Sequence, residues 1–405
     1  MTSNAIVGQS GGPTAAINAT LAGVIDALLK SEKIGKVYGA VNGIEGILHQ
    51  NIKELNPIFL DKANIGLLKN TPSAYLGSCR YKLPAGDAKT FETLFQIFKK
   101  KHIAYFFYIG GNDSMDTVMQ LSDYAKKTGQ DIKIIGVPKT IDNDLWGTDH
   151  CPGFGSAAKY VATSVAEIAR DAYCYDTDSV TIVEIMGRNA GWLTAASALA
   201  RSETLSAPDL IYLPEIPFST EAFFADLEKL HAKKKNIVVA ISEGIRDKDG
   251  NYIAADHKKT TDQFGHAQLG GAGKTLEAAV KEQFGCKCRS VELSVLQRCA
   301  SHFAASTDIN ESFKIGAAAV KAAFKGKTGE MMVFKRADSK NYRVTIGTMD
   351  IAQIANKEKK VPRAFISRGK NGVTQAFLDY ARPLILGEAK ISIKDGLPMH
   401  LVLKK

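Results

Sequence analysis

The sequence has no hydrophobic stretch long enough to cross a membrane. Its most notable apolar run, Ile103–Ile109, is the size of a strand, whereas a membrane helix needs about 18 apolar residues. The first residues, MTSNAIVGQSGG, also lack the basic segment followed by a long apolar stretch that defines a signal peptide. We therefore expect no membrane partner and a cytoplasmic location.

Cysteine is scarce, with 6 in 405 residues, which excludes a disulfide-stapled scaffold. Cys286 and Cys288 form a C-x-C pair that could touch a metal. No second Cys or His pair stands at zinc-finger spacing, so a structural role is favoured for both.

A dense basic stripe is also missing, although the formal net charge is +10. Such a charge suits nucleic acid, a membrane surface or small anions. The lysines lie in short scattered runs, such as Lys99–Lys101 and Lys359–Lys360, without interleaved aromatics, and are interpreted as solvated surface. Small anionic substrates are favoured, and no nucleic-acid partner is expected.

What the sequence does have is an alternation of short β-rich runs with longer helical patterns. A hydrophobic content of 45% is that of a globular protein, and the length allows two or three domains. The predicted strands are Ala5–Val7, Val37–Val41, Ile103–Ile109, Ile132–Val137, Val180–Ile185, Leu210–Leu213 and Ile237–Ser242. The predicted helices are Ala15–Leu29, Phe91–Lys101, Asp116–Lys127, Ser156–Ala172, Ala190–Arg201 and Glu221–Lys234. This alternation predicts βαβ units and parallel sheets.

Ligands of parallel sheets bind at the carboxyl ends of strands, so the loops that follow strands are the informative segments. In Gly8–Asn18, the glycines and the following helix can face an anion. They can equally serve only to join a strand to a helix. Gly110–Ser114, with sequence GGNDS, has the glycines and hydroxyl of a phosphate seat, yet Asp113 stands where it would repel a phosphate.

A third strand-end loop, Val137–Asp149, is rich in carboxylates. It is either an acidic surface turn or a reaction site. In an extended loop, Asp142 and Asp144 point to the same side, so one could accept a proton while the other holds a metal. Lys139 beside them would offset charge on a transferring phosphoryl group.

Two later segments complete the set. Arg188 follows a strand in VEIMGRNAGW, where its planar fork suits phosphate or sugar oxygens. QLGGAGKTLE resembles a P-loop, but Gln268 stands where the pattern needs Gly, so a helix start or a cleft segment is favoured. The polar segment Asp247–Gly273 is a candidate flexible loop or insertion.

The chain resembles the phosphofructokinases in three motifs that have the same order and spacing: GGNDS, PKTIDND and MGR. Four shorter motifs agree with this resemblance, namely SGG at residue 10, GSCRY at 77, SEG at 242 and LQR at 296. The resemblance implies an α/β fold with two parallel-sheet, three-layer domains and the active site in the cleft between them. The donor domain is expected at 1–150 plus part of about 295–345. The sugar-phosphate domain is expected at 151–294 plus the C-terminal segment to 405.

The family transfers a phosphoryl group to the 1-hydroxyl of fructose 6-phosphate with Mg²⁺. ATP-using members typically have Gly where this chain has Asp113, and pyrophosphate users have Asp. A carboxylate there takes the space and charge of the α-phosphate of ATP. Like charges about 4 Å apart cost around 4 kcal/mol at a dielectric near 20. Lys139 resembles the lysine that steadies pyrophosphate, so the resemblance implies reversible transfer from pyrophosphate, giving fructose 1,6-bisphosphate and phosphate.

The resemblance also assigns roles residue by residue. Catalytic roles are implied for Asp142, as the base for the sugar hydroxyl, and for Lys139, Asp113 and Thr140. Donor binding is implied for Gly11, Gly12, Arg80, Asn112 and Ser114. Sugar-phosphate binding is implied for Thr140, Asp142, Met186, Gly187, Arg188, Glu243, Arg289 and Arg298, the last two at the 6-phosphate. Mg²⁺ is expected at Asn112 and Asp144.

Three departures from the family pattern bear on these roles. Asn112 replaces a more usual Asp, although an amide carbonyl can still ligate Mg²⁺. Ser179 replaces an arginine that reaches into the neighbouring subunit, and Val295 an aromatic or His near the 6-phosphate. How subunits of the expected homodimer or homotetramer share the 6-phosphate is therefore open. Ala22 and Asp26 replace effector-binding arginines, so no nucleotide effector site of that type is expected.

Three rival interpretations remain. An ATP-dependent 6-phosphofructokinase is opposed by Asp113. A non-catalytic sugar-phosphate sensor should lose its base, whereas Asp142 is present. NAD and lipid kinases share a Gly-Gly-Asp loop but lack PKTIDND followed by MGR.

Overall fold

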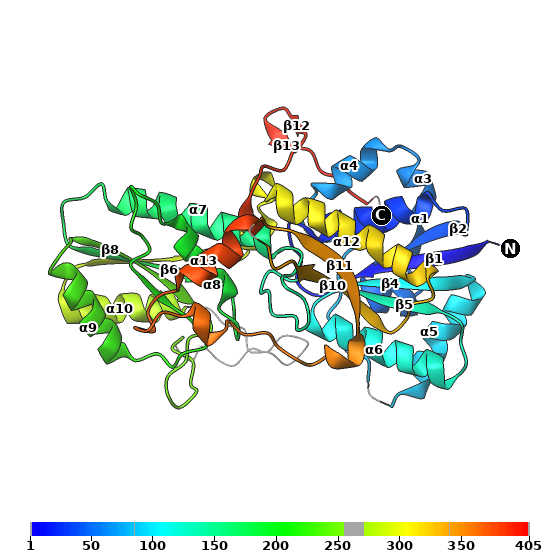
Figure 1. The fold of residues 1–405 in the computed structure, drawn as a ribbon, viewed down its shortest axis with the longest axis horizontal. Helices are drawn as coiled ribbons and strands as arrows, with labels where there is room; N and C mark the ends of the chain where they lie inside the picture. The colour runs from blue at the N-terminus through cyan, green and yellow to red at the C-terminus, as the bar shows by residue number, and fades with distance from the viewer. Residues whose placement is uncertain (1, 85, 255–270, 340, 404–405) are drawn as a thin grey trace.

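The computed structural model describes residues 2–84, 86–254, 271–339 and 341–403. Residues 255–270, most of the segment predicted to be a loop or insertion, lie outside the described residues. The described chain forms two α/β domains side by side (Figure 1). Within the described ranges, no helix has both the length and the apolarity needed to span a bilayer.

The first domain is built on a seven-stranded sheet with the order β11-β10-β5-β4-β1-β2-β3. The strands are β1 (Ser3–Gln9), β2 (Ile34–Ala40), β3 (Ile52–Glu54), β4 (Ile103–Gly110), β5 (Lys133–Pro138), β10 (Glu330–Arg336) and β11 (Val344–Asp350). The strands from β10 to β2 run parallel, as predicted, whereas β3 and β11 pair antiparallel at the two edges. A short connection between β10 and β11 permits only the antiparallel pairing.

Helices cover both faces of this sheet and complete three layers. Successive side chains of a strand point to opposite faces: Val7 packs in the cluster with α1 and α12, and Ile6 in the cluster with α5 and α6. These helices are α1 (Ile17–Leu29), α12 (Ser306–Phe324), α5 (Ala88–Lys100) and α6 (Asn112–Lys127). Short helices α2 (Gly43–Leu48), α3 (Asn56–Phe59) and α4 (Ala63–Lys69) lie in the connections.

Helices α1 and α12 touch through their backbones. A β-carbon at Gly23 of α1 would collide with the carbonyl of Phe313, and one at Gly316 of α12 would collide with the carbonyl of Thr20. The pair of glycines therefore sets the distance between the two helices.

The second domain has a four-stranded, fully parallel sheet with the order β7-β8-β6-β9. Its strands are β6 (Ser179–Ile185), β7 (Leu210–Tyr212), β8 (Asn236–Ser242) and β9 (Lys287–Glu292). One face is covered by α7 (Phe154–Ala172), α8 (Trp192–Ala196) and α13 (Gln375–Ala381), the other by α9 (Thr220–His231) and α10 (Ala272–Phe284). The predicted helix Ala190–Arg201 is shorter, because α8 gives way to the 3-10 turn η1 (Ser197–Ala200).

The chain returns to the first domain and then runs back along the second (Figure 1). This part contains α11 (Leu296–Cys299), η2 (Ser301–Phe303), η3 (Ile351–Gln353), η4 (Arg363–Phe365), η5 (Arg382–Ile385), β12 (Ile393–Lys394) and β13 (Leu397–Pro398). The predicted division gives the whole segment to residue 405 to the second domain. Leu401 and Leu403 instead pack against the core of the first domain.

All six cysteines are free thiols. Cys286 lies just before β9 and Cys288 within it. Burial raises the pKa of Cys288 to about 12. The structural role favoured for the C-x-C pair stays a prediction.

Candidate active site

A cleft of about 500 Å³ lies between the two domains. All predicted site residues line it except Gly187 and Arg289. They follow β1, β4 and β5 of the first domain and β6 and β8 of the second, in loops or in the first turn of α6, with Arg80 added from another loop and Arg298 from α11. The lining residues predicted from sequence are Gly11, Gly12, Arg80, Asn112, Asp113, Ser114, Lys139, Thr140, Asp142, Asp144, Met186, Arg188, Glu243 and Arg298.

The glycine turn after β1 is held against the loop that precedes Arg80. Gly11 has φ +76°; its N–H donates to the carbonyl of Cys79 (3.2 Å), and its carbonyl accepts from Ser78 Oγ (2.6 Å). At the start of α1, Thr14 Oγ1 accepts from the N–H groups of Ala16 (3.2 Å) and Ile17 (2.9 Å), so these two donors are already paired. The glycine turn, and not the helix start, is therefore the part of this segment that could face an anion.

The helix that begins in the cleft is α6. It starts at Asn112, four residues earlier than the apolar pattern predicts, and Gly111 at its N-cap offers no side chain to its N–H groups. Asp113 lies in the first turn, where the helix dipole stabilises a negative charge. The helix dipole therefore favours a negative charge at the position of Asp113, and a negative charge there would repel the α-phosphate of ATP.

Asn112 uses both ends of its amide to hold a distant segment. Its Oδ1 accepts from the N–H of Asn356 (3.0 Å), and its Nδ2 donates to the carbonyl of Lys357 (2.9 Å). An Asp at this position could not make the second bond, which gives a physical reason for the departure from the family pattern. A metal contact by Asn112 stays a prediction, for which one lone pair of Oδ1 remains.

Asn356 and Glu358 line the cleft and were missed by sequence reasoning. Glu358 stands in the run NKEKK, which reads as solvated surface and carries no motif. The two hydrogen bonds of the Asn112 side chain, to Asn356 and Lys357, hold this run at the cleft.

Lys139 is almost fully buried, with 2% of its surface exposed. Its Nζ donates to the carbonyl of Gly12 (2.6 Å). Burial lowers the pKa of Lys139 to about 8, opposed by Asp142 and reinforced by the charge of Arg298. A phosphate beside these cations would favour the charged amine.

The carboxyls of Asp142 and Asp144 are strongly perturbed. Burial, reinforced by the charge of Glu243, raises the pKa of Asp142 to about 6. Burial and the charges of Asp142 and Glu358 raise the pKa of Asp144 to about 7. Thr140 Oγ1 accepts from the N–H of Asp142 (3.1 Å) and fixes the turn. A carboxylate with a pKa near neutrality is suited to accept a proton.

The second-domain side of the cleft holds Glu243 and Arg188. Burial raises the pKa of Glu243 to about 7, and its Oε1 accepts from the N–H of Gly187 (3.3 Å). Gly187, at φ +138°, lies behind the lining and shapes this turn. The Nε of Arg188 is buried and has no hydrogen-bond partner within the described part of the chain. Because buried donors are normally paired, this atom points to a bound ligand.

Arg289 lies away from the cleft. It stands on β9, an edge strand, with its side chain 52% exposed, and its Nη1 is 3.3 Å from Asp171 Oδ2. A single chain therefore does not bring Arg289 to the predicted 6-phosphate site.

The P-loop-like segment is a helix start. Gly271 and Gly273 donate their N–H groups to the carboxylate of Glu184, at 3.2 and 2.7 Å. Residues 268–270 lie outside the described residues. A carboxylate of the protein itself thus takes the place that a phosphate would need.

Two α/β domains around a cleft of cations and perturbed carboxylates define a phosphoryl-transfer scaffold. The chain belongs to the phosphofructokinase family, whose pattern matches residues 4–323, so the resemblance read from the motifs is confirmed. It is 44% identical over 406 residues to a pyrophosphate--fructose 6-phosphate 1-phosphotransferase from Xanthomonas campestris, covering 99% of this chain and 96% of that protein. A protein of the same name from Halomonas elongata is 41% identical, with the same coverage.

The fold is likewise confirmed by a solved structure. The crystal structure of a pyrophosphate-dependent phosphofructokinase from Nitrosospira multiformis matches with a TM-score of 0.89 and 38% identity. The match covers 99% of this chain and 98% of that one.

Proposed function

We propose that this chain catalyses reversible phosphoryl transfer from pyrophosphate to the 1-hydroxyl of fructose 6-phosphate, giving fructose 1,6-bisphosphate and phosphate. The observation that carries the donor assignment is Asp113 at the head of α6, which lines the same cleft as Lys139. A carboxylate there repels ATP, whose α-phosphate would lie beside it. Pyrophosphate ends sooner and fits.

Asp142 is the general base of the forward reaction. It accepts the proton of the 1-hydroxyl while the 1-oxygen attacks a phosphorus of pyrophosphate. The bond from that phosphorus to the bridging oxygen breaks, and phosphate leaves. In reverse, the protonated Asp142 returns the proton to the sugar oxygen. A pKa of about 6 suits both directions near neutral pH.

The cations of the cleft stabilise charge on the transferring group. Lys139, Arg80 and Arg298 all line the donor side or its border, and the side chain of Arg298 lies against Gly12. Arg188 and Arg298 grip the 6-phosphate, while Glu243 holds a sugar hydroxyl. This assignment gives the unpaired Nε of Arg188 a partner.

The residues present fit Mg²⁺. Asp144, with Asn112, offers the hard oxygen ligands that this ion prefers. No three His, Cys, Asp or Glu side chains converge on one metal position in the described ranges. Mg²⁺ is commonly bound by one or two carboxylates together with substrate phosphates, so a complete protein cage is not needed. When bound, the ion neutralises charge on the phosphates.

Arg289 serves a neighbouring copy of the chain in a homodimer or homotetramer. Its place on an edge strand, with a side chain that is half exposed and a surface ion pair to Asp171, leaves it able to reach across an interface. We expect Arg289→Ala to raise the KM for fructose 6-phosphate in an enzyme that sediments as an oligomer. A monomeric enzyme with full activity would remove this assignment.

The function is tested with purified protein, fructose 6-phosphate and Mg²⁺, with either pyrophosphate or ATP. Turnover with pyrophosphate and far less with ATP is expected. Fructose 1,6-bisphosphate plus phosphate should also yield pyrophosphate at a comparable rate, because pyrophosphate and the sugar ester are close in transfer free energy. Equal rates with the two donors would overturn the donor assignment.

A further inference from the structure

Asn143 stands between the two carboxylates of the proposed reaction, Asp142 and Asp144. It is fully buried, and its backbone lies in the left-handed region, at φ +54°. Residues other than glycine rarely adopt this conformation, although Asn tolerates it better than most. The turn that aims both carboxylates therefore needs support from its surroundings.

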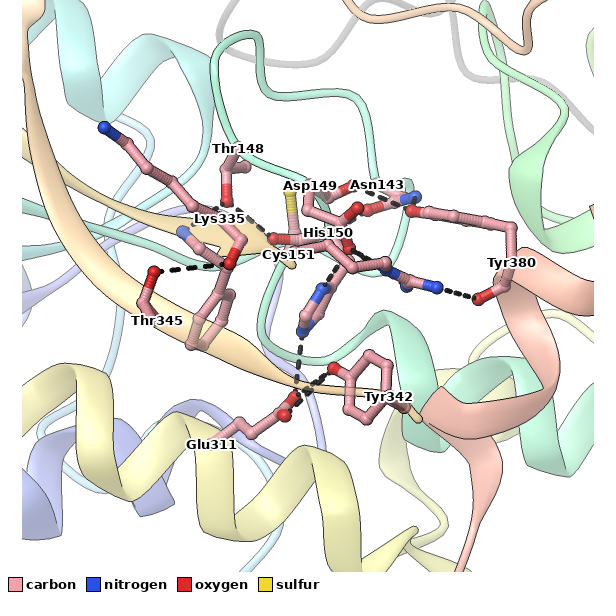
Figure 2. Close-up of polar contacts among 12 residues, drawn as sticks. Asn143, Thr148, Asp149, His150, Cys151, Glu311, Lys335, Tyr342, Thr345 and Tyr380 are labelled. Carbon is pink, nitrogen blue, oxygen red and sulfur yellow. Dashed lines mark hydrogen bonds and ion pairs between the residues drawn. The ribbon is translucent and has the colours of Figure 1, made fainter. Parts of the chain in front are cut away.

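The support comes from hydrogen bonds at both ends of the Asn143 amide. Its Nδ2 donates to Tyr380 Oη at 2.8 Å. Its Oδ1 accepts from the N–H of Cys151 at 2.9 Å and from Lys359 Nζ at 3.4 Å. Figure 2 shows the side chains of Asn143 and Tyr380 pointing toward each other beside the loop.

Tyr380 and Lys359 are themselves fixed to the same loop. Tyr380 Oη donates to the carbonyl of Asp149 at 2.8 Å, and Lys359 Nζ donates to that carbonyl at 2.9 Å. The backbone N–H of Lys359 donates to the carbonyl of Asp144 at 2.7 Å. The loop is thus held on the side facing away from the cleft, since neither Tyr380 nor Lys359 lines the cleft.

Both supporting residues lie beyond residue 323, where the match to the family pattern ends. Tyr380 is in α13 and packs with the aromatic rings of Trp192, Phe365 and Phe377. Those contacts fix the ring, so its hydroxyl has a defined place. A segment outside the matched region therefore reaches the turn between the two reacting carboxylates.

We propose that Tyr380 is a positioning residue, which holds Asp142 and Asp144 in their reactive geometry through its hydrogen bond to Asn143. The inference rests on the proposed function, because it assigns the two carboxylates their roles. It uses the general result that small misplacements of catalytic groups lower rates steeply.

Tyr380→Phe removes only the hydroxyl and keeps the packed ring. We expect kcat with pyrophosphate to fall about tenfold, while the KM values of both substrates change less than about threefold. The matched control is Tyr342→Phe. Tyr342 donates to Glu311 (2.9 Å) in the same polar network (Figure 2) but does not touch Asn143, so its kcat should stay at the wild-type value.

A double-mutant cycle separates positioning through Asn143 from general loosening of the fold. In an Asn143→Ala background, Tyr380→Phe should cause little further loss of kcat, because the bond between the two side chains is already gone and only the bond from Tyr380 Oη to the carbonyl of Asp149 remains to be removed. If the two losses in kcat multiply instead, Tyr380 does not act through Asn143, and the inference is wrong.

Hydrogen exchange gives a readout that does not depend on activity. Amides of residues 140–145 should exchange faster in Tyr380→Phe than in the wild type, and at the wild-type rate in Tyr342→Phe. Wild-type exchange of this loop, or an unchanged kcat, in Tyr380→Phe overturns the inference and leaves the proposed function standing. A wild-type protein without pyrophosphate-dependent turnover overturns the proposed function, and the assigned role of Tyr380 with it.

Discussion

The two sides of the cleft differ in how their polar groups are satisfied. On the donor side, the amide of Asn112 is bonded at both ends and the Nζ of Lys139 is held by a backbone carbonyl. On the sugar side, the buried Nε of Arg188 has no partner among the described residues. Glu243 accepts one long bond, from a backbone N–H, and its pKa is raised to about 7 by burial.

This difference indicates where each substrate contributes binding energy. A group already bonded within the protein is rigid before the ligand arrives and costs little ordering. A buried group without a partner destabilises the free protein, so a ligand that pairs with it gains that free energy back. Under the proposed function, the donor side is therefore ordered before its ligand binds, and the polar groups of the sugar side find their partners only in the bound ligand.

The largest effect is expected at Asp142, where the two sides meet. Asp142→Asn keeps the shape and removes the proton acceptor, so kcat should fall roughly 10²–10⁴-fold with little change in the KM for fructose 6-phosphate. The rate is measured in both directions. A variant that retains most of its kcat would place the base elsewhere.

A smaller effect is expected on the sugar side alone. Arg188→Lys keeps the charge but removes the planar fork and the Nε donor. The KM for fructose 6-phosphate should rise roughly 10–100-fold, because a charged hydrogen bond is worth about 1.5–3 kcal/mol. The KM for pyrophosphate should not change. The exposed Arg170, replaced by Lys, is the control; an equal rise in both KM values for Arg188→Lys would contradict the comparison.

Donor choice should shift about tenfold when Asp113 is replaced. Asp113→Gly removes the charge and opens space for the α-phosphate of ATP. The ratio of kcat/KM for pyrophosphate over ATP should drop by at least about tenfold, roughly 1.4 kcal/mol. Asp113→Asn separates charge from bulk and should give most of the shift if charge dominates. If the ratio stays at its wild-type value in both variants, this position does not select the donor.

The smallest effect is expected at His150, which does not line the cleft and contributes to the stability of the fold. Burial lowers the pKa of His150, but hydrogen bonds to Asp149 (2.8 Å) and Glu311 (2.9 Å) outweigh it and raise the pKa (Figure 2). A raised folded-state pKa stabilises the fold fully below the unfolded value of about 6.5. That stability is lost as pH rises through the folded-state pKa.

The corresponding test compares the wild type with His150→Asn. Their difference in urea midpoint should be largest near pH 6 and shrink toward pH 9. A difference that stays constant with pH would show that the pKa of His150 does not change on folding, and a difference that grows with pH would show that His150 is kept uncharged in the folded protein.

The sequence predicts the loops after strands well, because parallel strands bring their carboxyl ends to one edge. Asp113, Lys139 and Asp142 can therefore be placed together from the order of strands and loops alone. Local patterns also give most strand and helix positions, although they place the start of α6 at Asp116, because its first turn is not apolar.

The residues that sequence reasoning missed come from distant segments. Lys357 and Asn112, which share a hydrogen bond, are 245 positions apart, and Tyr380 and Asn143 are 237 apart. Neither local periodicity nor residue type predicts which residues so far apart in the sequence will share a hydrogen bond. Lys359 reads as solvated surface in a lysine-rich run, yet its Nζ bonds the carbonyls of two loop residues.

The paired glycines where α1 crosses α12 limit how the enzyme can change over evolution. Helix α1 follows the turn of Gly11 and Gly12, so its position sets that of the turn. Any larger residue at Gly23 or Gly316 must first push two backbones apart. A single added methyl group at this crossing would therefore shift the turn of Gly11 and Gly12 without touching it.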